Sequence, residues 1–88
     1  NWIKVDLGSA QTVGRVLLHW ESAYGRAYRI EVSTDNSAWT TVWSTTTGNG
    51  GLDIDAFTPV SARYVRMTGV TRATSYGYSL WEFEVYAK

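Results

Sequence analysis

Residues 76–86 read Tyr-Gly-Tyr-Ser-Leu-Trp-Glu-Phe-Glu-Val-Tyr. In the second half of this stretch the side chains alternate in character, as they do when successive residues of a β-strand point to opposite faces. Its Trp, Phe and Val would face a core, and Glu82 and Glu84 would face the other way. The Tyr-Gly-Tyr-Ser turn can hold two phenol rings beside the start of the strand. The stretch therefore predicts a strand that closes a core, with an aromatic loop at its beginning.

Short alternating runs recur through the rest of the chain with turn residues between them, and no long segment shows the helical period. Gly8-Ser9 would end the first strand, Pro59 would interrupt the chain, and residues 34–37 have the composition of a turn. About seven short antiparallel strands without a helix predict an all-β fold, either a β-sandwich or a small barrel. Besides the last strand, the expected strands cover residues 2–7, 15–20, 28–33, 38–43, 52–57 and 64–68.

The composition indicates one small domain, residues 1–88, and excludes several kinds of partner and site. With 8 basic and 8 acidic residues the formal net charge is 0, so neither a nucleic acid nor an anionic membrane, which would require a basic patch, is expected as a partner. The absence of Cys excludes disulfides and Cys-based metal or redox sites. The 5 Trp and 6 Tyr are many for 88 residues, which favours a subset of rings that faces a ligand.

Catalytic residues are weakly represented. His19 is the single His and lies in strand alternation, where a structural or surface role is usual. Glu82 and Glu84 share a strand face, which puts their Cβ atoms about 6–7 Å apart, near the carboxylate separation of glycoside hydrolases. Any acidic pair two residues apart has this spacing, as many solvated strand faces do, and Asp53 and Asp55 have it too. We therefore expect a protein that is not an enzyme.

A calcium site within these residues is not expected either. Ca²⁺ takes six or more oxygen ligands, usually from loops. Loop 45–51 offers backbone carbonyls but no carboxylate, and no Asp-x-Asp-x-Asp-Gly pattern occurs. No metal ion or other cofactor is therefore predicted.

Two loops contain the kinds of side chain that bind sugars. Glu21, Tyr24 and Arg26 bring a carboxylate, a phenol and a guanidinium into the first loop, and Tyr76 lies in the second, residues 71–78. Sugars present an apolar face of C–H groups and a rim of hydroxyls, which aromatic rings and charged side chains bind in a largely preformed site. Alternatively, the tyrosines of the second loop cap the core and Glu21 pairs with Arg26. The residues alone leave both interpretations open.

Four separated segments resemble the motifs of discoidin-like domains, also called coagulation factor V/VIII type C domains. Residues 2–8 resemble their Trp-x-x-Val-Asp-Leu-Gly opening, residues 28–39 their Tyr-x-Ile-x-x-Ser-x-Asp segment with its following Trp, and residues 62–66 their Ala-Arg-Tyr-Val-Arg strand. Residues 77–86 resemble the ending of carbohydrate-binding module family 32 and of modules attached to bacterial glucanases and chitosanases. The resemblance covers the whole chain. It implies a jelly-roll β-sandwich, galactose-binding-domain-like, that binds glycans through loops at one end and performs no chemistry.

The resemblance also implies a ligand. Such modules hold a secreted bacterial hydrolase on a β-linked polysaccharide, here chitosan or a β-glucan. Residues 20–24 resemble the Trp-Glu-x-Ala-Tyr motif of chitosan-binding relatives, which implies that the Glu of this motif contacts the sugar amines. The resemblance also implies a stacking tyrosine in the second loop, Tyr76, and a further carboxylate in the last strand, Glu82. The predicted ligand-binding residues are Glu21, Tyr24, Arg26, Tyr76 and Glu82.

Members of this family usually have a further N-terminal portion, with a first strand and a calcium loop, before the Trp-x-x-Val-Asp-Leu-Gly strand. These residues contain no counterpart of it, so the domain is expected to be N-terminally truncated relative to the family and to lack the calcium site. Either the fold tolerates the exposed sheet edge that would result, or another chain covers it, as in self-association. Within the sheet, Asp6 and Arg66 are expected to form an ion pair.

Two alternative functions stay open. The first is a discoidin-type adhesion domain that binds protein or lipid, although loops rich in Thr, Ser and Gly lack the apolar tips and basic residues of the lipid binders. The second is a small glycosidase that uses Glu82 and Glu84.

Overall fold

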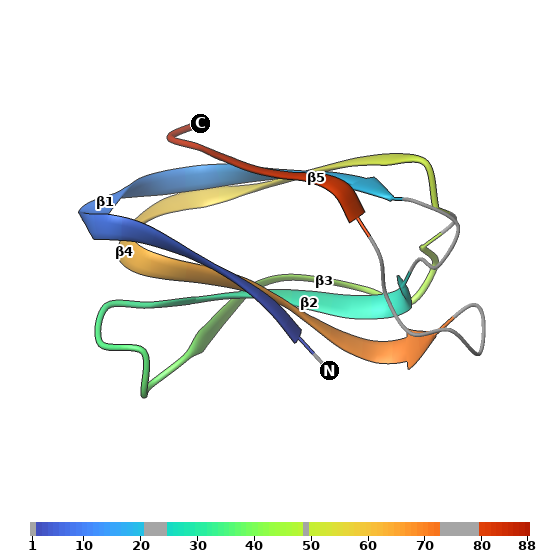
Figure 1. Ribbon diagram of the computed structural model, residues 1–88, viewed down its shortest axis with the longest axis horizontal. Helices are drawn as coiled ribbons and strands as arrows, with labels where there is room; N and C mark the ends of the chain where they lie inside the picture. Colours follow the sequence, from blue (N-terminus) through green and yellow to red (C-terminus); the bar gives the residue numbers. More distant parts are fainter. Residues whose placement is uncertain (1, 21–24, 49, 73–79) are drawn as a thin grey trace.

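The computed structural model is all-β, as the sequence predicts, and describes residues 2–20, 25–48, 50–72 and 80–88. All the strand pairings are antiparallel, within one sheet of order β3-β2-β4-β1-β5. The sheet folds over on itself, so its two longest strands run through both layers (Figure 1). The strands are β1 (Trp2–Trp20), β2 (Gly25–Ser33), β3 (Thr40–Thr45), β4 (Leu52–Arg72) and β5 (Leu80–Tyr86).

The pairing register defines the two layers. Strand β2 pairs with residues 64–72 of β4, while β5 pairs with residues 15–20 of β1. The β2 layer therefore contains β3, β2, the second half of β4 and the first half of β1. The β5 layer contains the first half of β4, the second half of β1 and β5 itself (Figure 1).

Five strands replace the seven expected, because β1 and β4 each join two of the expected runs. The prediction that Gly8-Ser9 ends a strand is wrong, since β1 bends there and continues. Its register against β4 shifts between Asp6 and Gln11, and shifts again after Val13. Gly8 has a φ of 86°, which residues with a side chain rarely adopt. Such bulges bend a strand without ending its pairing, and they allow one sheet to form both layers.

The core lies between the two layers. The alternation predicted for the second half of β1 and for β2 is confirmed, since each inward-facing residue of these segments is at most 6% exposed. Val65 and Met67 of β4 are also fully buried, beside β2. Full burial of an aliphatic side chain of this size stabilises the fold by about 1.5–3 kcal/mol. The inward-facing residues of β1 and β2 are Val16, Leu18, Trp20, Tyr28, Ile30 and Val32.

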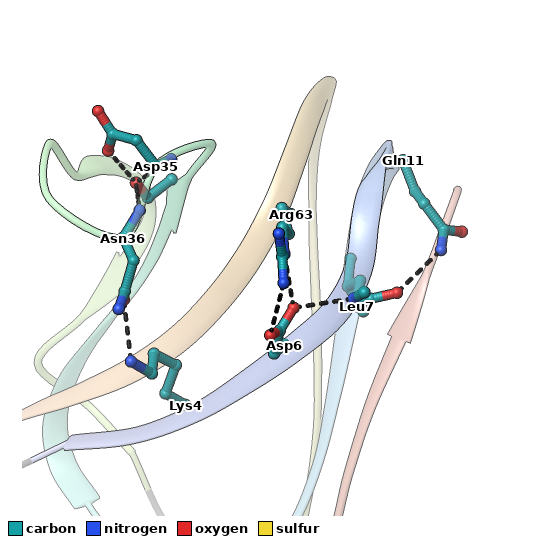
Figure 2. Close-up of polar contacts among 9 residues, drawn as sticks. Lys4, Asp6, Leu7, Gln11, Asp35, Asn36 and Arg63 are labelled. Carbon is teal, nitrogen blue, oxygen red and sulfur yellow. Dashed lines mark hydrogen bonds and ion pairs between the residues drawn. The ribbon is translucent and has the colours of Figure 1, made fainter.

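The chain reverses after β2, where the sequence predicts a turn. Oδ1 of Asp35 accepts hydrogen bonds from the backbone N–H groups of Ser37 and Ala38, each at 2.9 Å. These backbone bonds lower the pKa of the Asp35 carboxyl. Asn36 has a φ of 63°, and its Oδ1 accepts from Lys4 Nζ at 2.9 Å, which joins the turn to β1 (Figure 2).

The expected ion pair between Asp6 and Arg66 does not form, because each residue has another partner. Arg63 donates to both carboxylate oxygens of Asp6, from Nε at 3.0 Å and from Nη2 at 3.2 Å (Figure 2). Nε of Arg66 donates to Oε1 of Glu31 at 2.9 Å. The register explains the choice, since Glu31 is the Cα partner of Arg66 on β2.

One side of the first half of β4 is unpaired among the described residues. Residues 52–62 pair with β1, whereas β2 meets β4 only from residue 64 onward. Leu52 and Ile54 point outward beside this edge and are 58% and 55% exposed. Below, the free edge denotes residues 52–62 of β4.

Candidate functional site

The ends of four strands are paired where the predicted ligand-binding loops begin and end. Trp20, the last residue of β1, pairs with Leu80, the first residue of β5. Gly25, the first residue of β2, pairs with Arg72, the last residue of β4. We call this part of the molecule the loop end (Figure 1). The segments between these strands, 21–24 and 73–79, contain most of the two loops that the sequence proposes as ligand-binding (residues 21–26 and 71–78), and each is flanked by paired strand ends.

The loop between β3 and β4 joins the two layers at the loop end. Trp20 of the β5 layer donates its backbone N–H to the carbonyl of Gly51 at 2.8 Å. Three residues earlier, Gly48 donates its N–H to the carbonyl of Arg26 at 2.7 Å, in the β2 layer. Two bonds from one short loop thus fix the distance between the layers where the strands end.

Two of the five predicted ligand residues fall within the described residues, and both are exposed. Arg26 lies at the start of β2, in the β2 layer. Glu82 lies on the outer face of the β5 layer, where its Oε1 is 3.6 Å from Nδ1 of the exposed His19. The remaining three, Glu21, Tyr24 and Tyr76, lie outside the described residues.

The outer face of β5 bears the two glutamates of the glycosidase alternative. Glu82 and Glu84 share this face, as predicted, because their Cα partners on β1 are two residues apart. Tyr86 donates a short hydrogen bond to Glu84, and this bond lowers the pKa of the Glu84 carboxyl. A general acid needs a raised pKa, so this shift argues against Glu84 as the general acid of the glycosidase alternative.

A pair of carboxylates that the sequence suggests is solvated faces the core instead. Asp53 is the Cα partner of Leu18, and Asp55 is the Cα partner of Val16. Cα partners on neighbouring strands have side chains on the same face, so the two aspartates turn inward with these core residues. Asp55 is only 3% exposed. The sequence contains the Asp-x-Asp alternation, but only the pairing with β1 reveals which face is buried.

The two aspartates receive hydrogen bonds from aromatic side chains. Oδ2 of Asp53 accepts from the indole Nε1 of Trp20 at 2.9 Å and lies 3.1 Å from the Tyr28 hydroxyl. The same hydroxyl lies closer to Oδ2 of Asp55, at 2.7 Å. The Trp20 and Tyr28 rings meet edge to face, with centroids 5.6 Å apart. This aromatic–aspartate network joins the end of β1, the start of β2 and the start of β4.

Burial governs the acid–base behaviour of the network. Desolvation raises the pKa of Asp55 to about 6, and the charge of Asp53 adds to the rise while the Tyr28 hydrogen bond opposes it. Desolvation, followed by the contact with Asp55, raises the pKa of the Tyr28 hydroxyl as well. The hydroxyl therefore stays a donor at every physiological pH.

A cavity of about 260 Å³ lies beside this network, between β2–β3 and the first residues of β4. The indole Nε1 of Trp43 is buried and has no hydrogen-bond partner among the described residues. The sequence does not decide whether Trp43 is buried or faces a ligand, and the structure places it on the cavity wall. The lining residues that bear polar side chains are Tyr28, Trp43, Thr45, Thr47, Asp53 and Asp55.

In the described part of the chain, no group of three or more His, Cys, Asp or Glu side chains lies close enough together to hold a metal ion. The same residues include no helix with the length and apolar character needed to cross a membrane.

Residues 1–67 match the family model of NedA-like, galactose-binding domains of the F5/8 type C group. The fold superposes on chitosan-binding module 1 of a chitosanase/glucanase from Paenibacillus sp. IK-5 with a TM-score of 0.93 and 59% identity, over 97% of this chain and 67% of that one. Module 2 of the same enzyme, solved in complex with chitotriose, gives a TM-score of 0.92 and 55% identity over 97% of this chain and 68% of that one.

A curated relative is the polysaccharide lyase 8 family protein HylA of Enterococcus faecalis (strain ATCC 700802 / V583), 32% identical over 99% of this chain. The chain spans about two thirds of the length of the solved modules but only 7% of HylA. Both of these solved neighbours are chitosan-binding modules, not catalytic domains. The chain therefore belongs to the F5/8 type C family of NedA-like, galactose-binding domains.

Proposed function

We propose that this chain is a non-catalytic carbohydrate-binding module that holds a polysaccharide-degrading enzyme on a β-linked glycan, with chitosan or a β-glucan as the ligand. The observation on which the proposal rests is the meeting of paired strand ends at the loop end, Trp20 with Leu80 and Gly25 with Arg72. Loops that leave paired strands start from fixed positions, and largely preformed loop sites are what small ligands require. The 55–59% identity to modules named for chitosan binding supports the choice of sugar.

The predicted residues provide the chemistry for a glucosamine polymer. Glu21 and Glu82 would offer carboxylates to the sugar ammonium groups, and charge-assisted hydrogen bonds of this kind are about twice as strong as neutral ones. Tyr24 and Tyr76 would provide aromatic surfaces for the C–H face of the ring, and Arg26 would donate to sugar hydroxyls.

Titration calorimetry with chitotriose and cellotriose tests this function. Chitotriose should release heat with the wild-type chain, and Tyr76→Ala and Glu21→Gln should each weaken its binding. Tyr86→Ala is the matched control, because Tyr86 pairs with Arg15 at the far end of β5 and is 39% exposed. The absence of heat with both sugars, or an equal loss in Tyr86→Ala, would contradict the proposal.

The setting of the module is part of the proposal. Its relatives include modules of a bacterial chitosanase/glucanase and part of a bacterial polysaccharide lyase. We therefore infer a secreted bacterial protein in which residues 1–88 form one module, joined to a catalytic domain. About a third of each solved module has no counterpart in these residues, since the chain covers 67–68% of them.

Self-association through the free edge is the remaining part of the proposal. Unpaired strand edges pair with other chains unless charge or proline protects them. Pro59 protects one end of the free edge, whereas Leu52 and Ile54 at the other end are exposed, which supports such a contact there. Light scattering across a range of concentrations should show a dimer, and Ile54→Lys should abolish it. A monomer at every concentration would exclude this contact without affecting the sugar site.

A further inference from the structure

Asp53 lies between the core and the loop end. Its side chain points inward with that of its Cα partner Leu18, and its Oδ2 accepts the indole N–H of Trp20 at 2.9 Å. Trp20 is the last residue of β1 and directly precedes Glu21 in the sequence. One carboxylate oxygen therefore holds the side chain that stands at the entrance to residues 21–24.

The two aspartates of the network have different principal partners. The Tyr28 hydroxyl has one hydrogen to donate and lies 2.7 Å from Asp55 but 3.1 Å from Asp53. The shorter contact takes that hydrogen, which leaves the Trp20 indole as the principal donor to Asp53. Asp55 therefore bonds mainly to Tyr28 in the core, whereas Asp53 bonds mainly to Trp20 at the end of β1.

The pairing between β1 and β5 is irregular at Trp20. The pairing of β1 with β5 is in step up to His19, which pairs with Glu82, and shifts register before Trp20, which pairs with Leu80. A bulge of this kind redirects a side chain and interrupts the ladder of backbone hydrogen bonds. The buried indole, 3% exposed and bonded to Asp53, then fixes the direction in which the chain leaves the strand.

We propose that Asp53 is a positioning residue of the sugar site: it accepts the Trp20 indole N–H and so fixes where the segment that contains Glu21 begins. It does not contact the sugar. Trp20 also donates its backbone N–H to Gly51 and pairs with Leu80, so the residue that the indole anchors contacts two further strand or loop ends at the loop end. This assignment rests on the proposed carbohydrate function and adds to it a residue outside the predicted ligand set.

Three variants test the assignment by chitotriose titration and by NMR of the indole N–H groups. Asp53→Ala removes the acceptor and should weaken binding about threefold to tenfold, the usual effect of one hydrogen bond. Asp53→Asn keeps a carbonyl acceptor and should restore most of the affinity. Trp20→Phe removes the donor, and combining it with Asp53→Ala should cause no further loss, because both remove the same bond.

Asp55→Asn is the matched control, since Asp55 bonds Tyr28 and not Trp20. It should leave chitotriose affinity and the Trp20 indole resonance unchanged, while Asp53→Ala should shift that resonance upfield. Wild-type affinity in a folded Asp53→Ala variant, or an equal loss of affinity in Asp53→Ala and Asp55→Asn, would overturn the assignment. If the wild-type chain itself gives no heat, the proposed function fails, and the indole resonance still reports whether Asp53 holds Trp20.

Discussion

The Tyr28 hydroxyl lies 2.7 Å from Oδ2 of Asp55 in the space between the two layers. Both side chains are almost completely buried, Tyr28 at 1% and Asp55 at 3% exposure. The described residues place no cation against this carboxylate, so its charge is opposed by one hydroxyl and by little else. The space between the layers therefore contains a buried titratable group beside apolar side chains.

Stability should rise as Asp55 takes up a proton. Desolvation raises its pKa from 3.8 to about 6, so the folded state binds the proton more tightly than the unfolded state does. The stabilising contribution is complete below about pH 3.8 and is lost as the pH rises through about 6, a change of about 3 kcal/mol. Asp55→Asn should stabilise the chain at about pH 8 by about 1–3 kcal/mol and flatten this part of the profile. Urea unfolding at several pH values measures this pH dependence. Asp35→Asn is the control, because it changes an exposed carboxyl whose pKa is lowered, and it should not reproduce the effect of Asp55→Asn.

Arg66 should contribute more to stability than Arg63, although each pairs with one carboxylate. Arg66 bonds Glu31, whose side chain is 10% exposed, and stacks 3.9 Å from the Trp39 ring centroid. Arg63 bonds Asp6 in an exposed pair. Arg66→Met should lower the free energy of unfolding by about 1–3 kcal/mol, because the partly buried Glu31 then keeps only the Thr68 hydroxyl and the more distant Arg29 as partners. Arg63→Met should cost about 0–1 kcal/mol. Equal losses in urea unfolding would mean that burial does not distinguish the two pairs.

The acid limb of the stability profile should depend on Glu31. Burial alone would raise its pKa, but the hydrogen bonds from Thr68 and Arg66 outweigh burial and lower it below 4.5. A lowered pKa contributes stability above pH 4.5 that is lost as the pH falls through the folded value. Stability should therefore pass through a maximum between the titrations of Glu31 and Asp55. Glu31→Gln should weaken the fall on the acid side and leave the fall toward neutral pH intact, as thermal melts in a pH series would show.

Glu82 and Glu84 allow the proposed ligand contact to be tested against a neighbour on the same strand face. Glu82 is the partner of His19, next to the loop end, whereas Glu84 is the partner of Leu17, farther from it. Glu82→Gln should weaken chitotriose binding by about 1.5–3 kcal/mol, the usual contribution of a charged hydrogen bond. Glu84→Gln should leave binding unchanged. If calorimetry at low and high salt gives the Glu82→Gln and Glu84→Gln variants the same affinity for chitotriose, Glu82 does not belong to the predicted ligand set.

Gly14 should not tolerate a side chain. A Cβ at this position would overlap the carbonyl oxygen of Ala87 and come within 3.1 Å of Cγ of Pro59. The obstacle is largely backbone, so relief requires a shift of the chain. Gly14→Ala should therefore cost about 1–3 kcal/mol. Ser9→Ala, at an exposed position of the same bend, should stay within about 0.5 kcal/mol of the wild type in urea unfolding.

Much of the fold can be predicted from the alternation of residue types. Val16, Leu18 and Trp20 alternate with polar or less buried neighbours, and so do Tyr28, Ile30 and Val32, and all six are buried as expected. A strand buries one face only, so alternation identifies that face wherever apolar and polar residues differ clearly. The motifs that resemble discoidin-like domains likewise identify the family, because side chains at fixed spacing can be recognised without coordinates.

Only the tertiary structure decided which face of residues 52–55 is buried and which charged side chains pair. Residues 52–55 alternate Leu, Asp, Ile and Asp, and hydrophobicity would turn the leucine and isoleucine inward, yet the register against Leu18 and Val16 turns Asp53 and Asp55 inward instead. The choice of ion-pair partners depended on register in the same way. Arg66 lies opposite Glu31 and pairs with it, and Asp6 pairs with Arg63 instead. The sequence determined which residues could form strands and which loops contain sugar-binding chemistry. Pairing between segments far apart in the chain determined which strand faces are buried. Burial depends on both of the segments that pack together, whereas the local sequence describes only one of them.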